Sequence, residues 1–169
     1  CQHLGAKVVT LSDSSGFIYD KNGIDADKLA WIVDLKTKRR GRIEEYAKEF
    51  GAEYYEGERP WSIPCDYALP CATQNEINGE EASTLVKNGC KGISEGANMP
   101  SSKEAVDVFQ ASGVLFAPSK AANAGDVAVS GLEMSQNQAR MSWQETHLDE
   151  QLQGIMSGIH EKCAQYGEE

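Results

Sequence analysis

The sequence predicts an α/β fold with a mainly parallel sheet, followed by a helical tail. Up to Ala117, short β-branched runs alternate with segments of helical periodicity, and this alternation is typical of βαβ units. Capping-box patterns, in which Ser or Asn precedes Glu by three residues, mark helix starts at Asn78, Ser101 and Ser142. The helix that would follow Ser142 places four apolar side chains on one stripe: Leu148, Leu152, Ile155 and Ile159.

Local signals assign the other elements. We expect strands at residues 7–11, 52–55, 65–69, 91–95 and 114–117, and an extended segment at 17–19 that adds a hairpin. Asp25 suits the N-cap of a helix to residue 38, and residues 42–50 continue as a second helix after Gly41. The helices opened by the first two capping boxes end near Gly89 and Gly113. No domain boundary is visible before about Asn123.

Composition excludes several classes of protein. A length of 169 residues suits about one domain, and the net charge of -10 argues against nucleic acid and against an anionic membrane surface. No apolar run approaches the roughly 20 residues that span a bilayer. The five cysteines are odd in number and form no C-x-x-C pair, so a reduced, cytoplasmic protein without disulfides or zinc is expected. The chain starts at Cys1 rather than Met, which we interpret as a fragment boundary.

An acid and a basic run suggest a nucleotide site. Asp13 follows the first strand in a Ser-Asp-Ser-Ser-Gly stretch, where it could bond a ribose 2′-hydroxyl or simply form a turn. Lys36, Arg39 and Arg42 recur at a spacing of three residues. Such cations suit a 2′-phosphate, although basic residues at a helix end are also common on solvated surfaces.

Further polar residues follow the later strands. Thr73, Gln74 and Asn75 lie where ligands collect in open α/β sheets, although they could also cap a loop. Taken alone, Asn98 and Asn123 would be turn residues, and Ser130 would be a small residue packing a helix.

Three longer motifs carry a family resemblance. In chain order they read ALPCATQNE (68–76), SEGANMP (94–100) and PSKAANAGDVAVSGLEMSQN (118–137). Together they resemble the hexameric glutamate dehydrogenases of the Glu/Leu/Phe/Val dehydrogenase family, over essentially the whole chain. The resemblance implies that residues 1–122 are part of a Rossmann-like dinucleotide-binding domain. Residues 123–169 would be a helical segment that leads back toward a substrate domain.

The same resemblance implies roles for individual residues. Asp13, Ser14, Lys36, Arg39 and Arg42 match the NADP-type pattern, in which the last four hold the 2′-phosphate, so NADP is favoured over NAD. Other matches place Ala72, Thr73 and Gln74 against the coenzyme, and Gly96, Asn98 and Asn123 near the nicotinamide and its ribose. Ser130 matches the serine that bonds the substrate side-chain carboxylate, and Val127 the valine that shapes the pocket. A buried hydroxyl discriminates strongly against substrates that lack its partner.

The implied parent reaction is the reversible oxidative deamination of L-glutamate to 2-oxoglutarate and ammonia by a homo-hexamer. The alternatives are a dehydrogenase for another amino acid and a truncated, non-catalytic nucleotide-binding or interaction module. No catalytic residue carries over, because the family's catalytic lysines and aspartate belong to its N-terminal substrate domain, and no metal site is expected. We therefore expect the segment alone to be inactive.

Two departures from the family pattern stand out. The glycine-rich turn G-x-G-x-x-G and the first, central strand are absent, so we expect unpaired sheet edges and an unstable isolated segment. The family's Asn-Ala-Gly-Gly is here Asn123-Ala124-Gly125-Asp126. The carboxylate of Asp126 could repel a dicarboxylate substrate, or it could point to solvent from the first turn of a helix.

Overall fold

A computed structural model describes residues 1–167, which form two compact units, Cys1–Ile63 and a second that begins at Pro64. We describe each unit by itself. The boundary expected near Asn123 falls inside the second unit, between two of its helices. Of the helical segment expected at 123–169, residues 168–169 lie outside the described residues.

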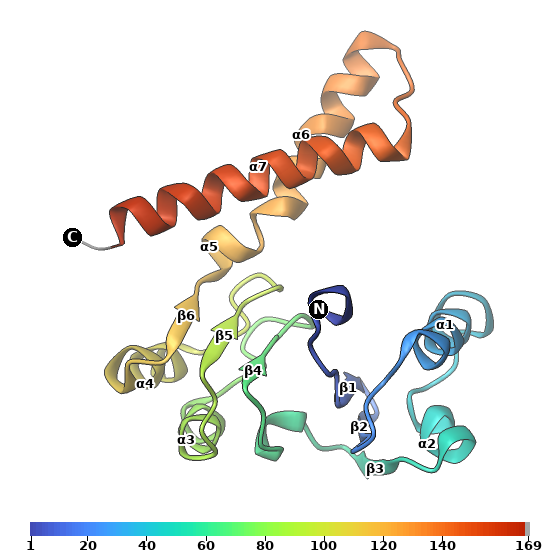
Figure 1. The fold of residues 1–169 in the computed structure, drawn as a ribbon, viewed down its shortest axis with the longest axis vertical. Coiled ribbons are helices and arrows are strands. Elements are labelled where there is room, and N and C mark those ends of the chain that lie inside the picture. Colours follow the sequence, from blue (N-terminus) through green and yellow to red (C-terminus); the bar gives the residue numbers. More distant parts are fainter. Residues whose placement is uncertain (168–169) are drawn as a thin grey trace. The chain divides into compact units, whose positions relative to one another are not determined.

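The first unit is a three-stranded sheet with two α-helices and three shorter helical segments, labelled η, of which η1 and η3 are 3-10 helices and η2 is a π-helix (Figure 1). Its elements in chain order are η1 (Gln2–Leu4), β1 (Thr10–Asp13), β2 (Gly16–Tyr19), α1 (Ala26–Asp34), η2 (Leu35–Arg39), α2 (Glu44–Phe50), β3 (Glu53–Glu56) and η3 (Pro60–Ser62). The buried core is formed by Ile18, Ile24, Ile32, Ile43 and Tyr46. The helix expected from Asp25 is confirmed, since the Asp25 carboxylate accepts a hydrogen bond from Lys28 N at 2.9 Å.

The sheet of the first unit confirms the hairpin expected at residues 17–19, but it differs from the mainly parallel sheet that the sequence predicts. Its order is β1-β2-β3, and both pairings are antiparallel. The reason is the connection between β1 and β2, where only Ser14 and Ser15 separate Asp13 from its partner Gly16. A parallel pair needs a crossover of a dozen or more residues, so such a short turn can only make a hairpin. Strand β1 also begins at Thr10, three residues later than expected.

The second unit contains the parallel sheet. Its elements are β4 (Tyr67–Ala68), α3 (Gly79–Lys87), β5 (Gly92–Ser94), α4 (Lys103–Ser112), β6 (Leu115–Ala117), α5 (Ser119–Ala122), α6 (Ala124–Ala139) and α7 (Glu145–Tyr166). The strands pair in the order β4-β5-β6, and the last two helices pack against each other (Figure 1). Because the strands are parallel, the loops that follow them meet at one edge of the sheet.

The helix starts of this unit test the capping-box patterns. Asn78 makes both bonds of a capping box with Glu81, as expected. At α4 the N-cap is Ser102 rather than Ser101, and its hydroxyl accepts from Ala105 N at 3.3 Å. The third pattern was wrong, because α7 begins after Gln144, which makes no side-chain cap bond. The apolar stripe of α7 is half-buried, as its pattern predicts.

Candidate functional site

Asp13 is the centre of a polar cluster in the first unit, which we call the Asp13 cluster (Asp13, Ser14, Lys36 and Arg42). One carboxylate oxygen, Oδ1, accepts from the backbone N and hydroxyl of Ser15, at 2.9 and 2.6 Å. The other, Oδ2, accepts from Lys36 Nζ at 2.6 Å and from Ile43 N at 2.9 Å. A carboxylate offers about four lone-pair positions. The four donors therefore occupy the accepting capacity of Asp13.

These hydrogen bonds stabilise the ionised form of the Asp13 carboxylate. Burial alone would raise its pKa, because a low-dielectric surrounding disfavours the charged form. The hydrogen bonds from Lys36, Ser15 and Ile43 outweigh burial and hold the pKa of Asp13 well below its ordinary value. The side chain is only 10% exposed, whereas that of Lys36 is 38% exposed. A carboxylate with little exposure to solvent thus holds an ammonium group that remains accessible to solvent.

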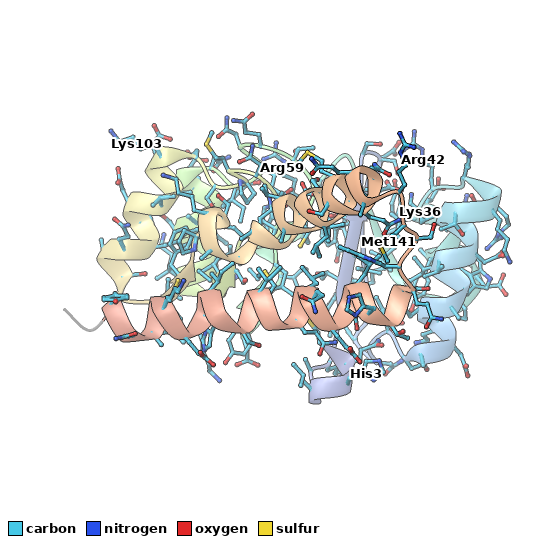
Figure 2. The ribbon with its side chains drawn as sticks, turned by 90° about the horizontal axis from the view of Figure 1, so that it is seen from above. His3, Lys36, Arg42, Arg59, Lys103 and Met141 are labelled. Carbon is cyan, nitrogen blue, oxygen red and sulfur yellow. The ribbon has the colours of Figure 1, made fainter. Side chains whose placement is uncertain are left out.

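A second cation, Arg42, reaches the same turn from the segment just before α2. Arg42 Nη1 donates to Ser14 Oγ at 2.6 Å, and Lys36 Nζ also donates to Gly41 O at 3.0 Å. Figure 2 labels Lys36 and Arg42, both of which are exposed. Two exposed cations and a hydroxyl therefore meet at the turn between β1 and β2. This donor set matches the oxygens of a phosphate group, which prefer charge-assisted bonds from Arg and Lys.

Arg39 lies apart from the Asp13 cluster. Its Nε is 3.2 Å from Asp34 Oδ2, and its guanidinium carbon lies 4.4 Å from the centre of the Trp31 ring. Stacking on an aromatic face is a common arrangement for Arg. The structure therefore brings Lys36 and Arg42 together, whereas Arg39 is held by partners of its own on α1.

In the second unit, three loops follow the parallel strands and are bonded to one another. We call them the strand-end loops: residues 70–77, 95–101 and 117–123. Gly96 N and Ala97 N both donate to Pro70 O, at 3.0 and 3.1 Å. Asn75 N donates to Met99 O at 3.0 Å. Backbone bonds thus join the first two loops along most of their length.

The residues expected at the coenzyme are found on these loops. Gly96 and Asn98 lie in the second loop, and Asn123 closes the third, between α5 and α6. In the first loop, the side chain of Gln74 is exposed, and the backbone N–H groups of Ala72 and Thr73 donate to Glu76 Oε2, at 2.9 and 2.8 Å. Residues 72 and 73 are therefore fixed through their backbone.

Sequence reasoning missed two buried acids that organise the loops. Glu76 and Glu95 are only 8% and 3% exposed. Glu95 Oε1 accepts from Ser101 N at 3.2 Å, and its Oε2 accepts from Ser119 N at 2.7 Å. The sequence carries no signal for either burial, because an acid in a polar loop is normally solvated, and the donor Ser119 of Glu95 lies 24 residues away.

The residues expected at the substrate lie on the first turns of α6. Val127 is 75% exposed, and Ser130 Oγ donates to the backbone oxygen of Asp126 at 3.1 Å. Asp126 is also exposed. Ser130 follows Asp126 by four residues, so the two side chains lie on the same face of the helix.

The described part of the chain contains neither a metal site nor a membrane span. Within residues 1–167, no group of three or more His, Cys, Asp or Glu side chains could hold a metal ion. Among these residues, no helix has the length and apolar character needed to cross a bilayer.

Comparison with known proteins identifies the family. The chain is 60% identical over 166 residues to "Glutamate dehydrogenase" of Bacteroides thetaiotaomicron, covering 98% of this chain and 37% of that protein. It is 55% identical over 163 residues to "NADP-specific glutamate dehydrogenase" of Salmonella typhimurium, covering 96% of this chain and 36% of that protein. The crystal structure of Plasmodium falciparum glutamate dehydrogenase superposes with a TM-score of 0.90 at 45% identity, over 99% of this chain and 37% of that one. The chain thus spans little more than a third of these relatives.

The family model for glutamate, leucine, phenylalanine and valine dehydrogenases matches residues 1–169. The chain belongs to this dehydrogenase family.

Proposed function

We propose that this chain is part of the coenzyme-binding region of an NADP-dependent glutamate dehydrogenase. In this proposal the parent protein interconverts L-glutamate with 2-oxoglutarate and ammonia, as a cytoplasmic homo-hexamer. Residues 1–122 form part of a Rossmann-like domain without its first strand, and residues 123–169 form a helical segment that leads to the substrate domain. The odd number of cysteines, without a C-x-x-C pair, supports a reducing compartment.

The observation that favours NADP over NAD is the hydrogen bonding of the Asp13 carboxylate. An acid at this strand end selects NAD by accepting a bond from the ribose 2′-hydroxyl. Here four protein donors already use the Asp13 carboxylate, so a hydroxyl would have to displace one of them. Lys36, Arg42 and Ser14 instead offer donors to a 2′-phosphate, and this donor set fits the group. Asp13 acts in the site by holding Lys36.

The remaining residues of the proposed coenzyme site bind and orient the coenzyme. The backbone of Ala72 and Thr73, with Gln74, lies along the coenzyme, while Gly96, Asn98 and Asn123 receive its nicotinamide half. An asparagine amide both donates and accepts hydrogen bonds, which suits a ribose or a carboxamide. When bound, the coenzyme supplies the hydride chemistry, and this chain contributes no acid or base to it.

Ser130 and Val127 bind the substrate in this proposal. The Ser130 hydroxyl donates to the side-chain carboxylate of glutamate, and Val127 limits the width of the pocket. A bond to a charged partner is worth about 1.5–3 kcal/mol. Ser130 therefore distinguishes glutamate from amino acids with apolar side chains.

A dehydrogenase for another amino acid is the second candidate, and Asp126 is the observation that favours it. Its carboxylate shares a helix face with Ser130 and would repel a dicarboxylate by about 1 kcal/mol at 4 Å in water. The test is to assay a full-length protein containing this chain with NADPH or NADH, ammonia and a panel of 2-oxo acids. The proposal requires a preference for NADPH and for 2-oxoglutarate. A preference for NADH would refute the coenzyme assignment, and a preference for an apolar 2-oxo acid would refute the substrate.

A further inference from the structure

Glu95 joins two of the strand-end loops that are far apart in sequence. Its two carboxylate oxygens accept from different segments, Oε1 from Ser101 N and Oε2 from Ser119 N. Ser101 closes the loop that carries Gly96 and Asn98, whereas Ser119 is the first residue of α5. The side chain is 3% exposed, so these bonds are shielded from water. Charge-assisted bonds of this kind are about twice as strong as neutral ones.

The bond to Ser119 sets the start of the segment that leads to Asn123. Helix α5 is a single short turn, and Asn123 N donates back to Ser119 O at 2.9 Å. On the other side of Glu95, its own backbone N donates to Ala117 O at 3.1 Å. Glu95 is therefore bonded to the third loop through its backbone and through its side chain. A shift at Glu95 would move Asn98 and Asn123 relative to each other.

We propose that Glu95 is a positioning residue for the nicotinamide half of the coenzyme, acting by fixing the second and third strand-end loops in one geometry. This inference rests on the proposed function. In open α/β sheets, ligands bind beyond the carboxyl ends of the parallel strands, and these loops form that edge of the β4-β5-β6 sheet. The Asp13 cluster, in the other unit, takes the 2′-phosphate. Loss of the Glu95 bonds should therefore weaken binding of the nicotinamide and leave the donors of the Asp13 cluster unchanged.

Two substitutions disturb the bonds of Glu95 from opposite sides. Glu95→Gln keeps the shape of the side chain, but its amide NH2 must face Ser101 N–H or Ser119 N–H, which leaves two donors opposed. Ser119→Pro removes the N–H that donates to Glu95. Proline suits this first helical position, and the preceding Pro118 already has the extended conformation (φ -69°, ψ 153°) that a following proline requires. Ser119→Ala keeps the N–H and isolates the loss of the hydroxyl.

The experiment measures binding in a full-length protein containing this chain. Calorimetric titrations with NADPH and with adenosine 2′,5′-bisphosphate, which carries the 2′-phosphate but no nicotinamide, separate binding of the nicotinamide from binding of the 2′-phosphate. Glu95→Gln should raise the Kd for NADPH roughly tenfold and leave that for adenosine 2′,5′-bisphosphate unchanged. Ser119→Pro should do the same, and should weaken NADPH binding more than Ser119→Ala does. The control is Glu133→Gln, an exposed acid on α6.

Each outcome decides the proposal. Unchanged NADPH binding in Glu95→Gln, or an equal loss for both ligands, would overturn the positioning role, since the second result indicates general damage to the fold. If Glu95→Gln does not yield folded protein, the comparison of Ser119→Pro with Ser119→Ala decides in the same way. A parent protein that binds neither ligand would instead refute the NADP assignment, and the positioning role with it.

Discussion

The guanidinium of Arg42 donates to the hydroxyl of Ser14 at 2.6 Å, across 28 residues of sequence. This bond places a permanent cation at the turn between β1 and β2, next to the Lys36 ammonium that Asp13 holds. Arg cannot lose its proton in a protein, and its planar fork matches phosphate oxygens. The pair Arg42–Ser14 therefore directly supports the proposal that this turn binds a 2′-phosphate.

Arg42→Ala should reduce the preference for NADPH over NADH. One lost charge-assisted bond, worth about 1.5–3 kcal/mol, lowers kcat/KM for NADPH roughly 10- to 100-fold and leaves that for NADH nearly unchanged. Steady-state kinetics of a full-length protein with both coenzymes measures the effect. Lys38→Ala is the matched control. It also removes one positive charge from this region, but Lys38 pairs with Asp34 rather than with the Asp13 cluster.

Arg39→Ala tests the same assignment at a cation that is expected to contribute less to binding of the 2′-phosphate. Arg39 is held by Asp34 and Trp31, and it would have to leave both partners to reach the cluster. The preference for NADPH should therefore fall less in Arg39→Ala than in Arg42→Ala. An equal or larger loss would mean that the conformation around Arg39 changes when the coenzyme binds.

Asp13→Asn should alter the dependence of stability on pH. The pKa of Asp13 in the fold lies below its unfolded value of 3.8, so its carboxylate contributes fully above about pH 5 and loses this contribution as the pH falls toward the folded pKa. The parent should be more stable than Asp13→Asn at pH 7, and the difference should narrow by about 1 kcal/mol between pH 5 and pH 3. Denaturant unfolding at a series of pH values measures it.

Asp107→Asn, which removes an exposed carboxylate on α4, is the control for loss of one negative charge. A constant difference between the parent and Asp13→Asn from pH 7 to pH 3 would contradict the bonding of Asp13 described above.

The sequence predicted which residue types gather at the Asp13 cluster but not how they bond. Asp13, Lys36 and Arg42 were all found from the strand end and the basic spacing. The spacing treated Arg39 as their equivalent, however, because a run of cations does not show that Trp31 and Asp34 will hold one of them. Likewise, the turn reading of Asp13 is correct as far as it goes, since Asp13 bonds Ser15, but the bond to Lys36 is tertiary.

In the fold too, several features that depend on neighbouring residues were predicted correctly, whereas others that depend on distant residues were missed. Asn78 was identified correctly as a cap because all partners of a capping box lie within three residues. The hairpin of β1 and β2 was expected, because it depends on a two-residue turn, but the antiparallel pairing of β2 with β3 was missed, because strand type alone does not fix the direction of strands far apart in sequence. Glu95 was missed because its partner Ser119 lies in another loop, 24 residues along the chain, and burial of an acid depends on donors that only the fold brings together.

Ser130→Ala should weaken substrate binding selectively. If Ser130 donates to the substrate side-chain carboxylate, its loss raises the KM for 2-oxoglutarate roughly 10- to 100-fold and leaves the KM for NADPH nearly unchanged. Ser135→Ala is a closely matched control, because Ser135 lies on the same helix and its hydroxyl makes the same kind of bond, to Gly131 O at 2.9 Å. An equal effect of both substitutions would show that only the helix was altered.

Asp126→Asn should improve the use of a dicarboxylate. Asp126 lies one turn before Ser130, and Ser130 Oγ bonds its backbone oxygen, so a carboxylate that reaches Ser130 also approaches the charge of Asp126. Repulsion of about 1 kcal/mol corresponds to a KM for 2-oxoglutarate roughly fivefold lower in the variant. Salt should reduce this difference, because the side chain is exposed and the screening length falls to about 3 Å at 1 M salt.

Asp107→Asn is again the control. Equal KM values for parent and Asp126→Asn at low salt would mean that Asp126 points to solvent and serves only the first turn of α6, where a negative charge favours the helix dipole.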